Sequence, residues 1–304
     1  MDTTDLAARL DCVGRTWTPQ QRLHLGNVAW ASAHGDGSAA PDIALTWGDP
    51  LWGFADIWLP ESAAEPATAA LHLASGITAH QLANAIGEIL QVAPHLTAEV
   101  SLQQTEVVNA LSEQGFRRAD GPWFAQLWRG LADLSDLPSY RLADGYSIRR
   151  VRRDELMERV EVHRRCWDPV RIKQMLDLPV TGDERGSSYS IEKHLAVIGS
   201  PVYREDLDLV VEAADGSLAA FGLGWLDLGA GSVLFEPVGT VPAHAKRGLA
   251  RALCAEILRV AHVLGATQAV VGPRGDGAYP VPRRLYEGLR MHEIAQFVSF
   301  TNEI

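Results

Sequence analysis

Three basic side chains surround a glycine in one short stretch, which holds Lys246, Arg247, Gly248 and Arg251. An apolar helical repeat begins directly after the glycine. A helix N-terminus presents unpaired backbone N–H groups and the positive end of the helix dipole, so it suits an anion. A glycine there has no Cβ, and a ligand can therefore approach the backbone closely. Together these features predict a binding site for a phosphate or pyrophosphate group.

The elements that must position this site can be predicted from the flanking residues. Apolar residues follow the basic stretch at spacings of four, four, three and four, which is typical of one helix face; they are Leu249, Leu253, Ile257, Val260 and Leu264. Before it, residues 238–241 favour a strand, and Pro242 prevents a helix from extending back into that strand. Pro237 and Gly239 are unusual inside a strand, and a β-bulge there would explain them.

This strand–loop–helix segment resembles the acetyl-CoA-binding motif of the GNAT acyltransferase superfamily. In that motif a strand of form V-x-(V/T)-x-P leads to a loop of form (Q/R)-x-x-G-x-(G/A). The loop here is AKRGLA, residues 245–250, and Ala245 stands where the family usually has Gln or Arg. The resemblance implies acetyl-CoA as the co-substrate. The residues that it implies for binding are Val238, Gly239, Thr240, Val241, Lys246, Arg247, Gly248, Leu249, Ala250 and Arg251.

Two side chains are the expected catalytic groups. Tyr286 lies in RRLYEGL, which resembles the segment where many GNAT members keep a tyrosine near the CoA sulfur, and a phenol there can protonate the departing thiolate. Glu236 lies just before the bulge, where members often have a carboxylate, and it is the expected general base. The preceding segment GDGAYPVPRR lacks the asparagine that often contacts CoA. The alternative bases are His163, His194, His244 and Glu192, and the candidates for binding a cationic substrate are Asp168, Glu205, Asp206 and Asp208.

Composition limits the remaining possibilities. The chain has 304 residues, 47% of them hydrophobic and 21% charged, as in soluble globular proteins. No apolar run approaches the roughly 20 residues that span a bilayer, and MDTTDLAARLD is not a signal peptide pattern. Three scattered cysteines and the absence of H-E-x-x-H and P-loop motifs predict a cytoplasmic protein without a metal site. A net charge of −11 argues against a nucleic-acid partner and is compatible with an amine substrate.

The order of expected elements indicates an internal repeat. From residue 146 the order of strands and helices resembles the GNAT fold, and the first half shows a similar order. We therefore expect a mixed α/β (α+β) fold with two tandem GNAT-like domains. Residues 1–132 form a degenerate first copy, 133–145 a linker and 146–304 the acetyl-CoA-binding copy. The first half is expected to be degenerate because LHLASGITAHQLANAI, residues 71–86, has no basic cluster. The alternative is an unrelated α/β domain.

Helices and strands are also expected at particular positions. Helices are predicted over 18–33, 78–92, 105–114, 153–167, 173–180, 190–198 and 283–289. Strands are predicted over 42–47, 54–59, 69–75, 96–102, 123–128, 146–151, 207–213, 218–228, 232–241, 267–271 and 294–301.

The resemblance implies an acetyl-CoA-dependent N-acetyltransferase that acts by direct attack of a small-molecule primary amine on the thioester. Neither a nucleic-acid nor a membrane partner is expected, and the sequence does not indicate an oligomeric state. Two alternatives stay open. One is a non-catalytic acetyl-CoA-binding or regulatory protein, and the other is a protein N-acetyltransferase.

Overall fold

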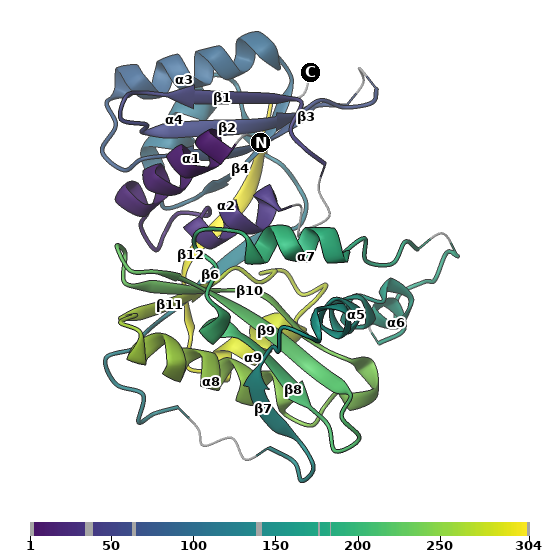
Figure 1. Cartoon of the computed structure of the whole chain (residues 1–304). Coiled ribbons are helices and arrows are strands. Elements are labelled where there is room, and N and C mark those ends of the chain that lie inside the picture. The colour runs from purple at the N-terminus through teal and green to yellow at the C-terminus, as the bar shows by residue number, and fades with distance from the viewer. Residues whose placement is uncertain are drawn as a thin grey trace.

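A computed structural model describes residues 3–33, 39–62, 65–137, 142–175, 177–182 and 184–302 (Figure 1). The α-helices are α1 (Thr3–Thr16), α2 (Leu25–Ser32), α3 (Ala79–Val92), α4 (Thr105–Glu113), α5 (Leu156–Cys166), α6 (Pro169–Met175), α7 (Ile191–Ile198), α8 (Leu249–Val263) and α9 (Val281–Glu287). Short 3₁₀ helices η1 (Glu205–Leu207) and η2 (Pro242–His244) precede β8 and α8. No helix in these ranges is both long enough and apolar enough to cross a membrane.

The strands form one mixed sheet through the whole molecule. They are β1 (Ile43–Trp47), β2 (Gly53–Trp58), β3 (Ala67–Leu73), β4 (Leu96–Ser101), β5 (Arg117–Arg118), β6 (Phe124–Gly130), β7 (Ser147–Arg150), β8 (Asp208–Glu212), β9 (Leu218–Asp227), β10 (Ser232–Thr240), β11 (Gln268–Val271) and β12 (His292–Thr301). Their spatial order is β1-β2-β3-β4-β12-β6-β11-β10-β9-β8-β7, and β5 pairs with β12. The expected mixed α/β architecture is therefore confirmed.

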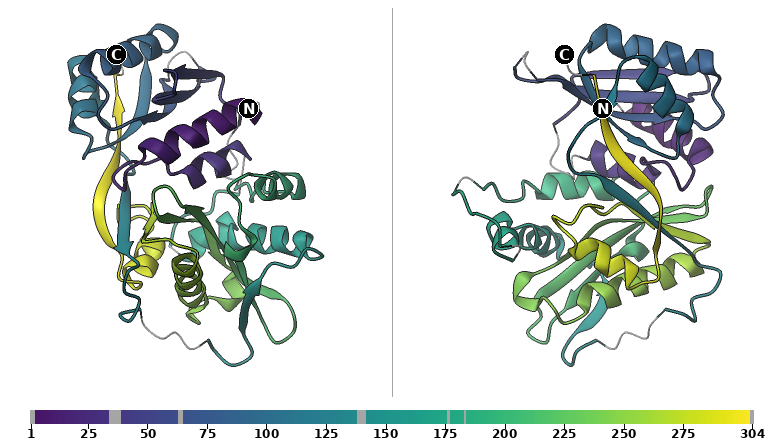
Figure 2. Two further views of the ribbon diagram at one scale, coloured as in Figure 1. Left: turned by 60° about the vertical axis from the view of Figure 1, so that its left-hand side comes forward. Right: turned by 180° about the vertical axis from the view of Figure 1, so that it is seen from behind.

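The two halves exchange their last strands. β12 leaves the second half and pairs with β4 of the first, with Phe297 opposite Ser101 and Thr301 opposite Thr97. β6, the last strand of the first half, pairs with β11 of the second. In Figure 2 the yellow strand β12 runs from the lower half of the molecule into the upper half. The halves thus share one sheet, and the expected domain limits stay a prediction.

A pair of parallel strands separates in the same way in each half. β10 and β11 are paired only from Ser232–Leu234 to Gln268–Val270. β3 and β4 are paired only from Ala67–Ala69 to Leu96–Ala98. Beyond these residues the backbones have no ladder partner on that side, so each half has an opening between two strands.

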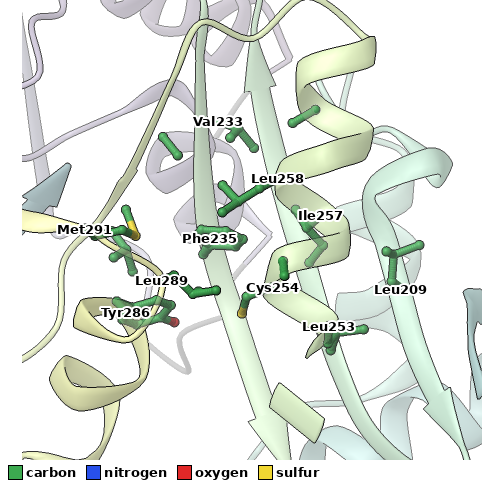
Figure 3. Packing of buried hydrophobic residues seen from close by; sticks show 14 of the residues in the cluster. Leu209, Val233, Phe235, Leu253, Cys254, Ile257, Leu258, Tyr286, Leu289 and Met291 are labelled. Carbon is green, nitrogen blue, oxygen red and sulfur yellow. The ribbon is translucent and has the colours of Figure 1, made fainter. Parts of the chain in front are cut away.

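Helices cover both faces of the second half of the sheet. On one face α8 packs its apolar side, which includes Leu253 and Ile257, against β9 and β10 (Figure 3). On the other face a cluster joins α2 of the first half to the second half, with Trp30 and Leu25 packed near Val160 and Trp225. This shared cluster fixes the first half against the strand that carries the expected site.

Two helix predictions need correction. The sequence predicted one helix over 18–33, but the structure has α1 before that range and α2 only from Leu25. The His24 side chain caps α2 by accepting a hydrogen bond from the Gly26 N–H, and that cap sets the helix start. The helix expected over 173–180 is α6, which ends at Met175, and residues 178–181 have no regular structure.

Candidate active site

The β-bulge expected at Pro237 and Gly239 is present. The register of β10 against β9 shifts between Phe235 and Val238, so Glu236 and Pro237 lie in the irregular segment. The indole N–H of Trp225 on β9 donates a 2.6 Å hydrogen bond to the backbone oxygen of Glu236. This bond supplies a partner to a carbonyl group that the bulge removes from the ladder. The bulge lies just beyond Leu234, where β10 and β11 separate.

The N-terminus of α8 is open to a ligand. Gly248 is its N-cap, with a left-handed φ of 75°, and no side chain accepts from the first-turn N–H groups. A Cβ built on Gly248 would meet no atom within 4 Å, so the position beside this residue is open. A left-handed residue followed by right-handed Leu249 aims successive N–H groups at one point, an arrangement that binds anions.

The three expected cations differ in their surroundings. Lys246 and Arg247 are exposed, and neither forms an ion pair with a carboxylate in the described ranges. Arg247 Nη1 donates to the Tyr146 hydroxyl at 2.7 Å. Arg251 lies instead against Gly288 at the end of α9, because a Cβ built there would come within 3.0 Å of Arg251 Nε. The structure therefore presents two of the three cations beside the helix entry.

Tyr286 lies across the opening from the bulge. Its ring is buried, with 6% of the residue exposed, and stacks on Phe235 at a centroid distance of 5.8 Å. Figure 3 shows its hydroxyl on the side of the ring that faces α8 and Cys254. Burial raises the Tyr286 pKa well above its usual range, and the nearby Cys254 and Glu236 side chains raise it further. The phenol is thus a proton donor at neutral pH, and the two expected catalytic residues lie within electrostatic reach of one another.

The opposite face of β10 is lined by aromatic groups. A Cβ built on Gly239 would lie 2.8 Å from the Trp167 ring and 2.7 Å from Phe221. Trp167 stacks on the His163 ring at 5.1 Å, and His163 contacts Tyr189 at 4.2 Å. Gly239 is thus required for this close packing. Sequence reasoning missed Trp167, because a single tryptophan at the end of a helix belongs to no recognisable motif.

Two of the alternative bases, His163 and His194, are poorly suited to accept a proton. Burial lowers the pKa of His163 to about 3 and that of His194 to about 4, with Arg159 contributing to both. Asp208 is fully buried and pairs with Arg159 at 2.9 Å. Asp206 pairs with Arg150 at 2.6 Å. Both Asp208 and Asp206 are therefore already paired with arginines within the fold.

Comparisons with known proteins agree with this architecture. No protein-family model matches the sequence, and no curated protein does either. Among solved structures, a tandem GNAT protein from the clavulanic acid biosynthesis pathway aligns with a TM-score of 0.59 and 17% identity, covering 99% of this chain and 95% of that one. A GCN5-related N-acetyltransferase from Sphaerobacter thermophilus aligns with a TM-score of 0.56 and 16% sequence identity, covering 100% of this chain and 94% of that one. FemX aligns with a TM-score of 0.62 and 10% sequence identity, covering 100% of this chain and 97% of that one.

The chain has the tandem GNAT fold. The strand opening in its second half lies beside the uncapped helix α8, and the opening in its first half lies beside α3. The two GNAT halves can therefore be compared at these helix starts, where Gly248 is the N-cap of α8 and Thr78 is the N-cap of α3.

In the first GNAT half, side chains at the start of α3 form hydrogen bonds with the backbone N–H groups there. Thr78 caps α3 by accepting from the Gln81 N–H at 3.2 Å, and the Gln81 side chain accepts from the Thr78 N–H at 2.9 Å. This capping box occupies two of the N–H groups at the helix start, those of Thr78 and Gln81. Residues 71–78, which precede α3, include no lysine or arginine equivalent to Arg247.

The opening between β3 and β4 is filled by the chain itself. The segment from Gln21 to Leu23, which joins α1 to α2, lies between Leu73 on β3 and Glu99 on β4. Gln21 Nε2 donates to the Leu73 oxygen at 2.7 Å, and Arg22 Nε pairs with Glu99 at 2.8 Å. The cavity that remains is about 10 Å³, which is room for about one water molecule.

Proposed function

We propose that this protein is an acetyl-CoA-dependent N-acetyltransferase that acetylates a primary amine of a small molecule. One observation carries the proposal. The uncapped N-terminus of α8, with Lys246 and Arg247 exposed beside it, lies next to the opening between β10 and β11. An anionic head group and an extended arm therefore have adjacent places to bind.

The residues fit an acyl-CoA donor. The first-turn N–H groups of α8, Lys246 and Arg247 would hold the pyrophosphate. The bulged backbone from Val238 to Val241 would bind the arm and orient the thioester carbonyl. Contacts through the backbone do not need a particular side chain, so Ala245 is compatible with this role.

The reaction needs three proton transfers. Glu236 accepts a proton from the substrate ammonium, and the amine nitrogen then attacks the thioester carbonyl carbon. As the C–S bond breaks, Tyr286 donates its proton to the departing sulfur, and the Tyr286 oxygen then takes up the second proton that the attacking nitrogen loses as it becomes the amide. The raised pKa of Tyr286 keeps that proton in place until the thiolate forms.

The proposed donor site is in the second half only. In the first half the capping box of Thr78 and the segment Gln21–Leu23 occupy the corresponding helix end and opening. We therefore expect one acetyl-CoA per chain, and we regard the first half as a degenerate copy whose α2 packs over β9 and β10 of the second. The observation that favours the non-catalytic alternative is Ala245.

Calorimetric titration with acetyl-CoA tests the proposal. The wild-type chain should bind one equivalent, and Gly248→Glu should abolish binding because it places a carboxylate where the phosphates would lie. Gly76→Glu is the matched control, since Gly76 also has a positive φ, of 82°, and open space around it. Equal loss in both variants, or no binding by the folded wild type, would refute the donor site. If binding holds, CoA release with a panel of amines would identify the acceptor, and no release with any amine would favour the non-catalytic alternative.

A further inference from the structure

We propose that Tyr146 is a positioning residue for donor binding, because its hydroxyl holds the Arg247 guanidinium beside the N-terminus of α8. The inference rests on the proposed function and adds a residue outside the loop motif. Tyr146 immediately precedes β7, about a hundred residues before the loop in the sequence, so only the fold brings the two together.

Two side chains of the segment that joins β10 to α8 meet the Tyr146 hydroxyl oxygen. Arg247 Nη1 lies 2.7 Å from the Tyr146 hydroxyl oxygen. His244 Nδ1, at the end of η2, lies 2.9 Å from the same oxygen. The Arg247 guanidinium carbon also lies 5.8 Å from the centre of the Tyr146 ring, within range of a cation–π contact. The phenol is therefore held from two sides and in turn restrains the arginine.

The direction of the hydrogen bond between Tyr146 and Arg247 follows from the chemistry of the guanidinium. Arginine can only donate, so the Tyr146 oxygen accepts from Arg247. The role of His244 Nδ1 toward the same oxygen is set by the histidine tautomer. Arg247 donates one N–H to Tyr146, and its other N–H groups can donate to an anion.

The arginine is not part of a surface ion pair. Other arginines of this half pair with carboxylates: Arg149 with Glu155 and Arg283 with Glu287. In the described residues Arg247 has a hydroxyl as its partner and no carboxylate. Its positive charge is thus retained, while the hydroxyl limits the rotamers that a long exposed side chain would otherwise sample. Restricting the side chain before binding reduces the entropy lost when an anion binds.

A double-mutant cycle tests this role. Tyr146→Phe keeps the ring and removes only the oxygen, and we expect it to weaken CoA binding about three- to tenfold, the worth of one hydrogen bond. In an Arg247→Gln background the same change should have almost no effect, because Tyr146 acts through Arg247. A purely structural effect of Tyr146 would be the same in both backgrounds. Thermal melting of each variant checks folding.

Tyr203→Phe is the matched control. It also removes a tyrosine hydroxyl that is hydrogen-bonded in this half, to Asp208 at 3.2 Å, and it should leave CoA affinity unchanged. Unchanged affinity in Tyr146→Phe, or an equal loss in both backgrounds, would overturn the positioning role while leaving the donor site intact. Failure of the wild-type chain to bind CoA would instead remove the proposed function and this inference with it.

Discussion

The indole nitrogen of Trp225 lies 2.6 Å from the backbone oxygen of Glu236 and donates a hydrogen bond to it. Trp225 is fully buried, and α2 packs on it so closely that a Cβ on Gly26 would lie 2.4 Å from the Trp225 Cβ. A helix of the first half thus supports the side chain that caps the bulge in the second. The bulge geometry therefore depends on packing between the halves.

Replacing Trp225 with phenylalanine should loosen the bulge. Trp225→Phe leaves the Glu236 carbonyl without its partner, and we expect the free energy of unfolding to fall by about 1–3 kcal/mol. The kcat for acetyl transfer should fall as well, since the thioester would be less well oriented. Denaturant unfolding and CoA-release kinetics measure the two effects. Trp58→Phe removes an indole hydrogen bond to the Ala39 oxygen at an exposed site. It should lower the free energy of unfolding less than Trp225→Phe does and leave kcat unchanged. Equal stability of Trp225→Phe and wild type would contradict the prediction.

The proposed acid and base can be separated by kinetics. Tyr286→Phe keeps the stacking on Phe235 and removes the proton donor, so kcat should fall about a hundredfold or more while the Kd for acetyl-CoA stays the same. Glu236→Gln should also lower kcat. Tyr279→Phe is the control, because it alters a neighbouring phenol and leaves Tyr286 in place. An unchanged kcat in both Tyr286→Phe and Glu236→Gln would remove both assignments.

Gly239 should tolerate no side chain. In Gly239→Ala the new Cβ would lie 2.8 Å from Cys166 Cβ and from the Trp167 ring, and relieving this overlap should cost about 1–3 kcal/mol of stability. Gly87→Ala, in α3 with open space around it, should instead stabilise the protein by about 0.5–1 kcal/mol. Thermal unfolding compares the two. Partial recovery of stability in the double variant Gly239→Ala, Trp167→Ala would confirm the site of the overlap, and equal stability of Gly239→Ala and wild type would contradict it.

Acid should destabilise the fold through four buried histidines. Burial lowers the pKa of His24 and His163 to about 3 and of His72 and His194 to about 4, against 6.5 when unfolded. Because the folded pKa values are depressed, the unfolded state binds more protons below pH 6.5. Stability is then constant above that pH and falls as the pH drops below it, by up to about 1.4 kcal/mol per pH unit for each histidine.

Chemical denaturation at pH 7 and pH 5 measures this slope. His194→Gln should reduce it, whereas His80→Gln should not, because His80 is exposed on the surface of α3. A free energy of unfolding that is the same at both pH values would show that these histidines are not held neutral in the folded chain.

Local sequence was sufficient for several features of the proposed site. The apolar spacing after Gly248 predicted α8, and Pro237 with Gly239 predicted the bulge in β10. Such features depend on residues close in the chain, through helix periodicity and the backbone limits of proline and glycine. The similar order of elements in the two halves likewise indicated the tandem fold before any pairing was known.

Contacts between distant residues were decided only by the tertiary structure. The exchange of β6 and β12 between the halves has no local signal. Each strand would need the same alternation of side chains whether it paired within its own half or with the other half. Tyr146 beside Arg247 and Gln21 in the first opening are likewise separated widely in sequence from their partners. Sequence alone determined which residues favour a strand, a bulge or a helix start. The fold decided which of them meet, because that depends on how the whole sheet buries its two faces.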